Sequence, residues 1–193
     1  MLFCPFMCIQ QIVIGCILGD SYLTKSGCLQ IEHSIKQKEY IYWKYEKLKT
    51  IVRSEPVQVS RYDKRTDRIY LSYRFYTKAI FKDLRSLFYP TGKKIIPYNI
   101  EKILISNLAL AILYMDDGGR GGNTKKGVII NIAGYDVQSR KRLQLAIFKN
   151  YNIELNLHKN GQLYIPAKSY NNFYNCIYHF LIPCMEYKLS ITP

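Results

Sequence analysis

Two apolar stretches of this chain end in aspartate: residues 13–20 read VIGCILGD, and residues 110–118 read LAILYMDDG. Each is an apolar run of helical length closed by a carboxylate, and half the chain lies between them. Two copies of one motif at this spacing predict two similar halves that face each other. Because the chain carries a net charge of +14, the pair also predicts an acidic, metal-binding centre directed at a polyanion, and nucleic acid is the polyanion we expect.

Composition narrows the class of protein further. The 193 residues are 48% hydrophobic, which suffices for one ordinary core or two small fused cores. The charged fraction of 22% excludes a disordered polyelectrolyte. No pair of the six cysteines has CxxC spacing, which favours free thiols in a reducing, intracellular compartment. The apolar N-terminal run has no basic residue before it and contains Gln10 and Gln11, so we expect neither a signal peptide nor a membrane helix.

The spacing of apolar residues predicts the same order of elements in both halves. In the first half we expect helix 9–19, strand 28–35, helix 37–52, strand 56–61, a charged turn at 63–67, strand 68–76 and helix 77–88, followed by a linker to about residue 102. In the second half we expect the motif helix, a glycine-rich loop at 118–127, strand 128–135, a helix to about 151 capped by Asp136 or Ser139, a hairpin of 153–158 with 162–165, and helix 169–181. This order predicts an α+β fold of two pseudo-symmetric αββαββα repeats, divided into residues 1–102 and 103–193.

The first motif helix carries a small-residue face. Gly15 and Gly19 are four residues apart and so lie on one side of a helix, where they allow a second helix backbone to approach closely. Tight packing alone would explain these glycines, and a lone aspartate after a helix is usually a cap or turn residue. The matched pair favours a metal instead. Close packing would bring Asp20 and Asp117 together at helix C-termini, where the negative end of the helix dipole destabilises each carboxylate by about 0.3–1 kcal/mol. A bound divalent cation reverses that repulsion, and carboxylates with main-chain carbonyls suit Mg²⁺.

Polar strand faces and charged loops predict a DNA-binding surface. A β-ribbon fits the major groove, where arginine reads guanine and amide side chains read adenine; a solvated face is the alternative. Two lysines, Lys94 and Lys188, occur at matching points of the halves and have the charge needed beside a scissile phosphate. The expected DNA contacts are Gln30, Ser34, Gln58, Ser60, Arg61, Lys64, Arg65, Arg68, Tyr70, Ser72, Arg74, Tyr76, Lys125, Lys126, Asn131, Asn156, His158 and Lys159. The other two histidines, His33 and His179, are expected to pack in the interior.

These motifs resemble the paired LAGLIDADG helices of homing endonucleases. The similarity is greatest to the monomeric, two-repeat subgroup typified by the mitochondrial omega-intron endonuclease. Residues 17–22 (ILGDSY) resemble its first motif and residues 114–119 (YMDDGG) its second, although Ser21 stands where the family has glycine. The segments KKIIP at 93–97, FLIP at 180–183 and YKL at 187–189 match in the same order.

The resemblance implies a saddle of antiparallel sheets over DNA, with the motif helices at the interface between the halves. It implies that Asp20 and Asp117 bind Mg²⁺, or Mn²⁺ in its place, with the main-chain carbonyls of Gly19 and Asp116. Lys94 and Lys188 would be the active-site lysines. The implied reaction is hydrolysis of both DNA strands across the minor groove, leaving 3′ overhangs at a long asymmetric site, by a monomer encoded in an intron of a mitochondrion or other organelle.

Two other functions remain open on this sequence. An RNA maturase on the same scaffold would bind intron RNA and assist splicing. A repressor-like module would bind DNA without metal and use the aspartates structurally. The intact Asp20, Asp117 and both lysines favour the nuclease, because binding alone does not require them.

Overall fold

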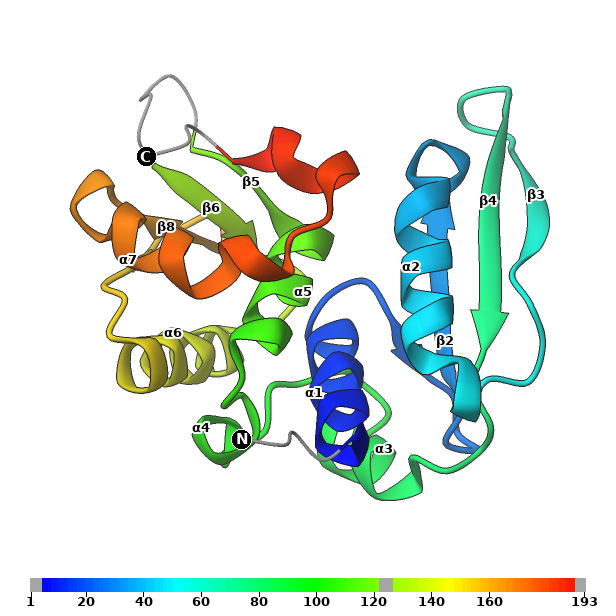
Figure 1. The fold of residues 1–193 in the computed structure, drawn as a ribbon, viewed down its shortest axis with the longest axis horizontal. Coiled ribbons are helices and arrows are strands. Elements are labelled where there is room, and N and C mark those ends of the chain that lie inside the picture. Colours follow the sequence, from blue (N-terminus) through cyan, green and yellow to red (C-terminus); the bar gives the residue numbers. More distant parts are fainter. Residues whose placement is uncertain (1–4, 122–126, 190–193) are drawn as a thin grey trace. The chain divides into compact units, whose positions relative to one another are not determined.

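The structure is a computed structural model that describes residues 5–121 and 127–189. It divides into two compact units, one formed by Asp20–Arg85 and the other by Met1–Gly19 together with Ser86–Pro193. Each unit contains one four-stranded antiparallel sheet with helices packed against it (Figure 1). These units are grouped by contacts in space, whereas the predicted division between residues 102 and 103 separates repeats along the sequence. That division stays a prediction.

The unit Asp20–Arg85 is built on the sheet order β1-β2-β4-β3. Its strands are β1 (Tyr22–Leu23), β2 (Leu29–Ser34), β3 (Val57–Asp63) and β4 (Arg68–Tyr76), and its main helix is α2 (Lys38–Leu48), with the short 3₁₀ helices η1 (Ile35–Gln37) and η2 (Lys49–Ile51) on either side. Helix α2 packs on β2 and β4, where the ring of Tyr45 meets Phe75 edge-on at 5.9 Å. The alternation of residues 28–35 is confirmed, since Leu29, Ile31 and His33 are buried.

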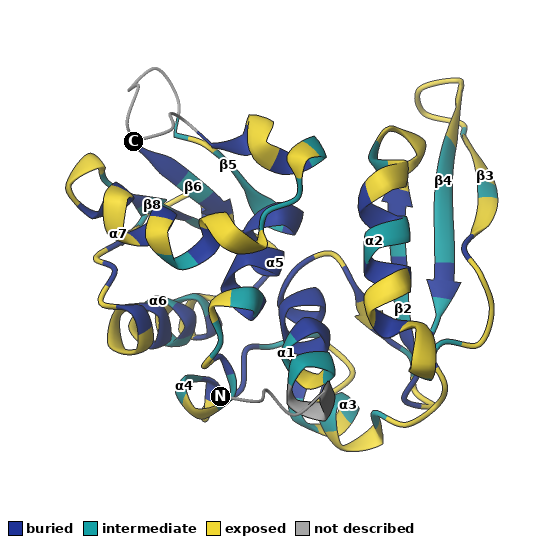
Figure 2. Cartoon of the chain, in the orientation of Figure 1, coloured by how far each residue is buried: buried dark blue, intermediate teal, exposed yellow. Residues whose placement is uncertain are grey.

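The hairpin of β3 and β4 is partly buried at one end and exposed at the other. Its charged turn is confirmed, because Asp63 pairs with Arg68 and Asp67 takes a positive φ of 51°. The face of β4 that carries Ile69, Leu71, Tyr73 and Phe75 is buried only at Phe75, near the end of the strand, whereas Ile69 is 66% exposed. Helix α2 covers β2 and part of β4, so the distal part of the hairpin has both faces in solvent (Figure 2).

The predicted helix over residues 77–88 is too long, since α3 covers only Lys82–Phe88. Thr77 instead continues the sheet. Its backbone N–H donates to the Leu29 carbonyl at 3.0 Å, its hydroxyl accepts from the Leu29 N–H at 2.9 Å, and it forms a bridge with Val52. Pairing to β2 therefore outweighs the helical periodicity at this point.

The second unit repeats this plan with the sheet order β5-β6-β8-β7. Its elements are α1 (Pro5–Leu18), α4 (Ile100–Ile103), α5 (Asn107–Asp117), β5 (Gly118–Arg120), β6 (Val128–Asn131), α6 (Val137–Tyr151), β7 (Asn156–Leu157), β8 (Gln162–Ile165), α7 (Ala167–Ile177) and the 3₁₀ helices η3 (Tyr178–Phe180) and η4 (Pro183–Lys188). In chain order, α1-β1-β2-α2-β3-β4-α3 and α5-β5-β6-α6-β7-β8-α7 both read αββαββα. The predicted α+β class with two such repeats is confirmed.

Two boundaries in this unit differ from expectation. The start of the predicted glycine-rich loop is a strand, because Gly118 pairs with Ile130 and Arg120 with Val128. Helix α5 begins at Asn107 with Ser106 as its cap, after the short helix α4, rather than directly after residue 102. Of the two candidate caps for α6, Asp136 is the cap, and it accepts from the Ser139 N–H at 2.9 Å.

The core of this unit lies along helices α1 and α5, which pack side by side (Figure 1). Both are buried on all sides along most of their described length, which explains why both motifs are apolar throughout. Among residues 5–121 and 127–189, no helix combines the length and apolarity needed to cross a bilayer. The cysteines in the described residues are free thiols, as predicted.

Candidate active site

The glycines of α1 set how closely the two motif helices approach. A Cβ atom built on Gly15 would lie 2.7 Å from the Ala109 carbonyl oxygen, and one on Gly19 would overlap the Asp116 carboxylate. Real side chains do not tolerate such close approaches, so glycine is required at both positions. The predicted close approach on this helix face is therefore confirmed, and it sets the end of α1 beside the acidic end of α5.

Each of the two predicted lysines binds a carbonyl at the end of a motif helix. Lys94 Nζ donates to the carbonyl of Gly19 at 2.7 Å. Lys188 Nζ donates to the carbonyl of Asp116 at 2.8 Å and also to that of Met115. Gly19 immediately precedes Asp20 and Asp116 immediately precedes Asp117, so the two repeats place their lysines equivalently. The last carbonyls of a helix lack intrahelical partners and carry partial negative charge, which makes them natural acceptors for an ammonium.

The segment that carries Lys188 is fixed by three hydrogen bonds to its backbone. The hydroxyl of Tyr114 donates to the Lys188 carbonyl at 2.7 Å. Arg120 Nε donates to the carbonyls of Tyr187 and Leu189, at 3.1 and 3.0 Å. Lys188 is itself buried at 8% exposure. The ammonium therefore has little freedom to leave the end of α5.

The segment that carries Lys94 is held by helix α6 of the other repeat. The Ile96 N–H donates to the Ser139 hydroxyl at 3.0 Å, and Arg142 Nε donates to the Ile96 carbonyl at 2.7 Å. The ring of Tyr135 lies 5.5 Å from Lys94 Nζ. These contacts couple the lysine of the first repeat to the second.

Tyr135 completes the end of helix α1. Its hydroxyl donates to the Leu18 carbonyl at 2.8 Å. Burial raises the pKa of Tyr135 well above its ordinary value, and the negative charge of Asp117 raises it further. The phenol is therefore a permanent donor at neutral pH. The roles of Tyr135, Ser139 and Arg142 were not predicted from the sequence. Their partners lie more than 40 residues away along the chain, and no local sequence pattern marks contacts of that kind.

The oxygen atoms at the ends of these two helices are of the type that a hard divalent cation binds. Asp117 is the last residue of α5 and is partly exposed, whereas Asp116 is buried. A carbonyl oxygen has two lone pairs, so those of Gly19 and Asp116 can accept from lysine and still bind a metal. A carboxylate with main-chain carbonyls is the donor set of Mg²⁺ or Mn²⁺.

Asp20, the other predicted carboxylate, belongs to the sheet unit Asp20–Arg85. Its side chain is 46% exposed, and its Oδ2 lies 4.0 Å from Nδ1 of His33. His33 is buried, as the sequence predicted, but it is joined at 3.0 Å to the buried side chain of Lys44 rather than packed among apolar groups alone. The same prediction was wrong for His179, which is exposed.

The predicted DNA-binding face of the first sheet is organised around Glu32. Its carboxylate accepts from Arg74 Nε at 2.6 Å, from Arg61 Nη2 at 2.7 Å and from the Ser72 hydroxyl at 2.6 Å. Burial acts to raise the pKa of Glu32, but the hydrogen bonds from Arg74 and Ser72 outweigh it and the pKa lies below its ordinary value. The strand pairs of Gln30 with Tyr76 and of Ser34 with Ser72 extend the same face. These predicted contacts therefore form one polar surface, whose role toward DNA stays a prediction.

The remaining predicted DNA contacts lie on exposed strands and turns. On the first sheet, Gln58, Ser60, Lys64, Arg65, Arg68 and Tyr70 are all exposed, and Arg65 bonds to Asp63 in the turn at 3.1 Å. On the second, Asn131, Asn156, His158 and Lys159 are exposed, with His158 stacked on Tyr164 at 5.3 Å. Lys125 and Lys126 lie outside the described residues.

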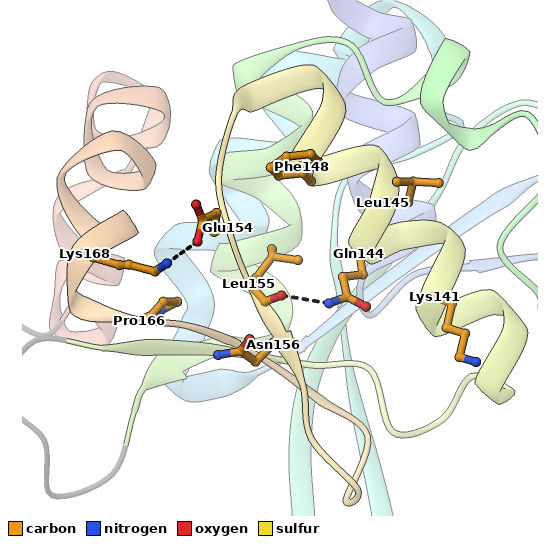
Figure 3. Close-up of a pocket in the computed structure, with 9 residues that line it drawn as sticks. All are labelled: Lys141, Gln144, Leu145, Phe148, Glu154, Leu155, Asn156, Pro166 and Lys168. Carbon is orange, nitrogen blue, oxygen red and sulfur yellow. Dashed lines mark hydrogen bonds and ion pairs between the residues drawn. The ribbon is translucent and has the colours of Figure 1, made fainter.

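A pocket of about 420 Å³ lies elsewhere on this unit, between helix α6 and the segment that leads into β7 (Figure 3). Gln144 Nε2 donates to the Leu155 carbonyl at 2.7 Å across it, and Lys168 pairs with Glu154 at its rim. Of the predicted site residues it includes Asn156 alone. The lysines and carboxylates described above therefore lie apart from this pocket, and it has no part in the candidate site.

Comparisons with known proteins agree with this geometry. The profile of the LAGLIDADG DNA endonuclease family matches residues 10–173. The chain is 30% identical to probable intron-encoded endonuclease 1 of Wickerhamomyces canadensis, over 93% of this chain and 83% of that protein. It is 32% identical to the cytochrome b mRNA maturase bI2 of Debaryomyces hansenii, over 62% of this chain and 46% of that protein. A solved structure of the homing endonuclease I-WcaI bound to its DNA recognition sequence is similar with a TM-score of 0.82 and 30% identity, covering 94% of this chain and 85% of that one.

Proposed function

Because the chain belongs to the LAGLIDADG DNA endonuclease family, we propose that it is an intron-encoded homing endonuclease that hydrolyses both strands of a specific DNA site with Mg²⁺. Family membership confirms the predicted enzyme class, a hydrolase that cuts DNA. The metal, the products and the roles of individual residues are parts of the proposal.

The matched lysine–carbonyl pairs carry the proposal. Each repeat brings a lysine ammonium to the main-chain carbonyl that precedes its acidic residue, at 2.7 Å for Lys94 and 2.8 Å for Lys188. A purely structural helix end needs no cation at such a matched position in both repeats. Two equivalent centres are what an enzyme needs to cut two strands.

The chemistry follows from the residue types. Asp20 and Asp117 would each supply a carboxylate to bound Mg²⁺, with the carbonyls of Gly19 and Asp116, and the metal would supply activated water and stabilise the leaving oxygen. Lys94 and Lys188 hold positive charge where negative charge develops on the phosphate. Tyr135 keeps the end of α1 and Lys94 in place and stays protonated while doing so.

Double-stranded DNA is the proposed substrate. The net charge of +14 attracts a phosphate backbone, and the face around Glu32 offers the side chains that read base edges. The DNA-bound state of the similar I-WcaI supports this choice. We propose a monomer that acts on a long asymmetric site, across the minor groove and with 3′ overhangs, in a mitochondrion or other organelle. The intron-encoded endonuclease and the cytochrome b mRNA maturase among the relatives support an origin in an intron.

A maturase role is the second candidate. The similarity to the cytochrome b mRNA maturase supports it, although this chain spans about half the length of that relative. Binding intron RNA needs the basic surface but not the two aspartates, so both activities are compatible with one chain.

The test is cleavage of DNA that carries the intron-less allele of the host gene, with Mg²⁺, Mn²⁺ or EDTA. We expect a double-strand break with 3′ overhangs in either metal, no break in EDTA, and loss of the break in Asp20→Asn and in Asp117→Asn. Asp83→Asn, at an exposed position in the first turn of α3, is the matched control and should cut normally. Tight binding without cutting, unchanged by all three substitutions, would reject the nuclease and leave splicing of intron RNA as the function to assay.

A further inference from the structure

A buried lysine–histidine pair lies directly behind Asp20. Lys44 on α2 is fully buried, His33 on β2 is 4% exposed, and Lys44 Nζ lies 3.0 Å from His33 Nε2. Their neighbours in this core, such as Ile31 and Ile41, are apolar. Burying an ammonium here costs free energy, and apolar residues of similar size would serve stability as well or better. Stabilisation of the fold therefore does not explain why Lys44 and His33 are buried together, and a functional role is the alternative.

The chemistry of the pair fixes which way the imidazole donates. Beside a charged Lys44, whose ammonium can only donate, His33 Nε2 accepts, and the single proton of a neutral ring is then on Nδ1. The ring of Tyr40 supports the charged lysine, because its centroid lies 4.3 Å from Lys44 Nζ. It also packs on His33 at 4.8 Å between ring centroids.

That Nδ1–H faces the carboxylate of Asp20. Nδ1 lies 4.0 Å from Oδ2, longer than a direct hydrogen bond. The His33 side chain is buried, whereas the Asp20 side chain is 46% exposed. The arrangement is thus a buried imidazole beside a partly exposed carboxylate.

We propose that Lys44 and His33 are positioning residues for Asp20, which orient its carboxylate for metal binding through the Nδ1–H tautomer that Lys44 imposes. This inference rests on the proposed function, because it assigns a purpose to the orientation of Asp20. It also assigns His33 the role of a donor rather than a metal ligand, since a protonated Nδ1 cannot coordinate a cation.

The second repeat has no such histidine. Counted from the strand pairs Tyr22 with Gln30 and Gly119 with Ile129, the counterpart of His33 is Ile132, which is buried and apolar. We therefore expect the pair to act on Asp20 and to have no equivalent at Asp117. Its loss should slow the cutting of one DNA strand and leave the other strand unaffected.

Strand-resolved cleavage of Lys44→Met tests this directly. We expect the strand whose cutting depends on Asp20 to be cut on the order of 10–100-fold more slowly, a range typical of groups that orient metal ligands. The cutting rate of the other strand and the DNA affinity should stay unchanged. Lys44→Gln retains an N–H donor and should recover part of the rate. Lys47→Met, at an exposed position of the same helix, is the control and should behave as the unsubstituted protein.

A second readout does not depend on cleavage. The ¹⁵N resonances of His33, assigned by comparison with His33→Gln, report which ring nitrogen carries the proton. We expect the Nδ1–H form in the unsubstituted protein, loss of that preference in Lys44→Met, and a shifted Nδ1 resonance in Asp20→Asn. An Nε2–H ring, or equal slowing of both strands, would overturn the inference. Failure of the unsubstituted protein to cut any DNA would instead reject the proposed function, and the resonances would still decide the tautomer and its contact with Asp20.

Discussion

The ammonium of Lys188 is buried against two carbonyl groups at the end of helix α5. Lys188→Met removes the donor and leaves both acceptors without it, so the free energy of unfolding should fall by about 1–3 kcal/mol. Lys94→Met removes the bond to the Gly19 carbonyl from a partly exposed group, and we expect a smaller loss because that group is less buried. Urea unfolding of the two variants measures the difference, and an equal loss in both would contradict this description of the two lysines.

Buried tyrosines should make the protein sensitive to alkali. Burial raises the pKa of Tyr114, Tyr135 and Tyr151 above the ordinary value. As the pH rises past about 10, tyrosines in the unfolded chain lose protons that the folded chain retains, which favours unfolding. Stability from these groups is therefore complete below that pH and is lost above it. We expect the unfolding free energy to fall between pH 10 and 12, less steeply in Tyr135→Phe, and a flat profile would contradict the burial of these phenols.

At the scale of residues, the sequence predicted groups that recur in matching positions. Asp20, Asp117, Lys94 and Lys188 could be chosen because each has a counterpart at the same point of the other half. Groups without a counterpart could not be chosen. Tyr135 reaches α1 across more than a hundred residues, and the partnership of His33 with Lys44 depends on how α2 packs on β2.

Close packing of the motif helices depends on glycine at their contact. In Gly19→Ala the new Cβ would overlap the Asp116 side chain, so the helices must separate. Overpacking of this kind costs about 1–3 kcal/mol in the free energy of unfolding. Gly134→Ala is the matched control, because a Cβ at that position would have no heavy atom within 4 Å. Thermal or urea unfolding measures both variants, and an unchanged Gly19→Ala would show that the helix contact is looser than described.

The sheet face around Glu32 offers a test of DNA contact. Glu32 bonds to both Arg61 and Arg74, which offsets part of their positive charge. Glu32→Gln leaves the arginines and removes the negative charge, so DNA binding should tighten and depend more steeply on salt concentration, in the direction set by counterion release. Dissociation constants at several salt concentrations measure the effect. Glu39→Gln, an exposed position in the first turn of α2, is the control, and equal behaviour of the two variants would argue against DNA contact on this face.

At the scale of elements, periodicity predicted most helices and strands but not their ends. The segment 28–35 alternates and is a half-buried strand, while 77–81 has helical spacing and yet pairs with the sheet through Thr77. Gly118 and Gly119 look like a loop in sequence but pair with β6. In both cases a partner strand distant in sequence supplies hydrogen bonds that no local pattern contains.

At the scale of the whole molecule, the repeated order of elements was the most predictable property. The strand orders β1-β2-β4-β3 and β5-β6-β8-β7 are the same topology formed twice. That duplication could be inferred from two motifs and a repeated order of helices and strands, with little identity between the halves. What one sequence does not contain is the DNA target, because base readout depends on the shape and deformability of the DNA as well as on side chains.

We propose that Asp20 and Asp117 form two separate catalytic centres, one for each DNA strand. Single-turnover cleavage of a duplex labelled on either strand, with Mg²⁺, measures the two rates separately in Asp20→Asn and Asp117→Asn. We expect each substitution to depress the cutting of a different strand most strongly, so that nicked DNA accumulates with the nick on opposite strands in the two variants. Identical effects of both substitutions on both strands, or cutting that neither substitution slows, would contradict it.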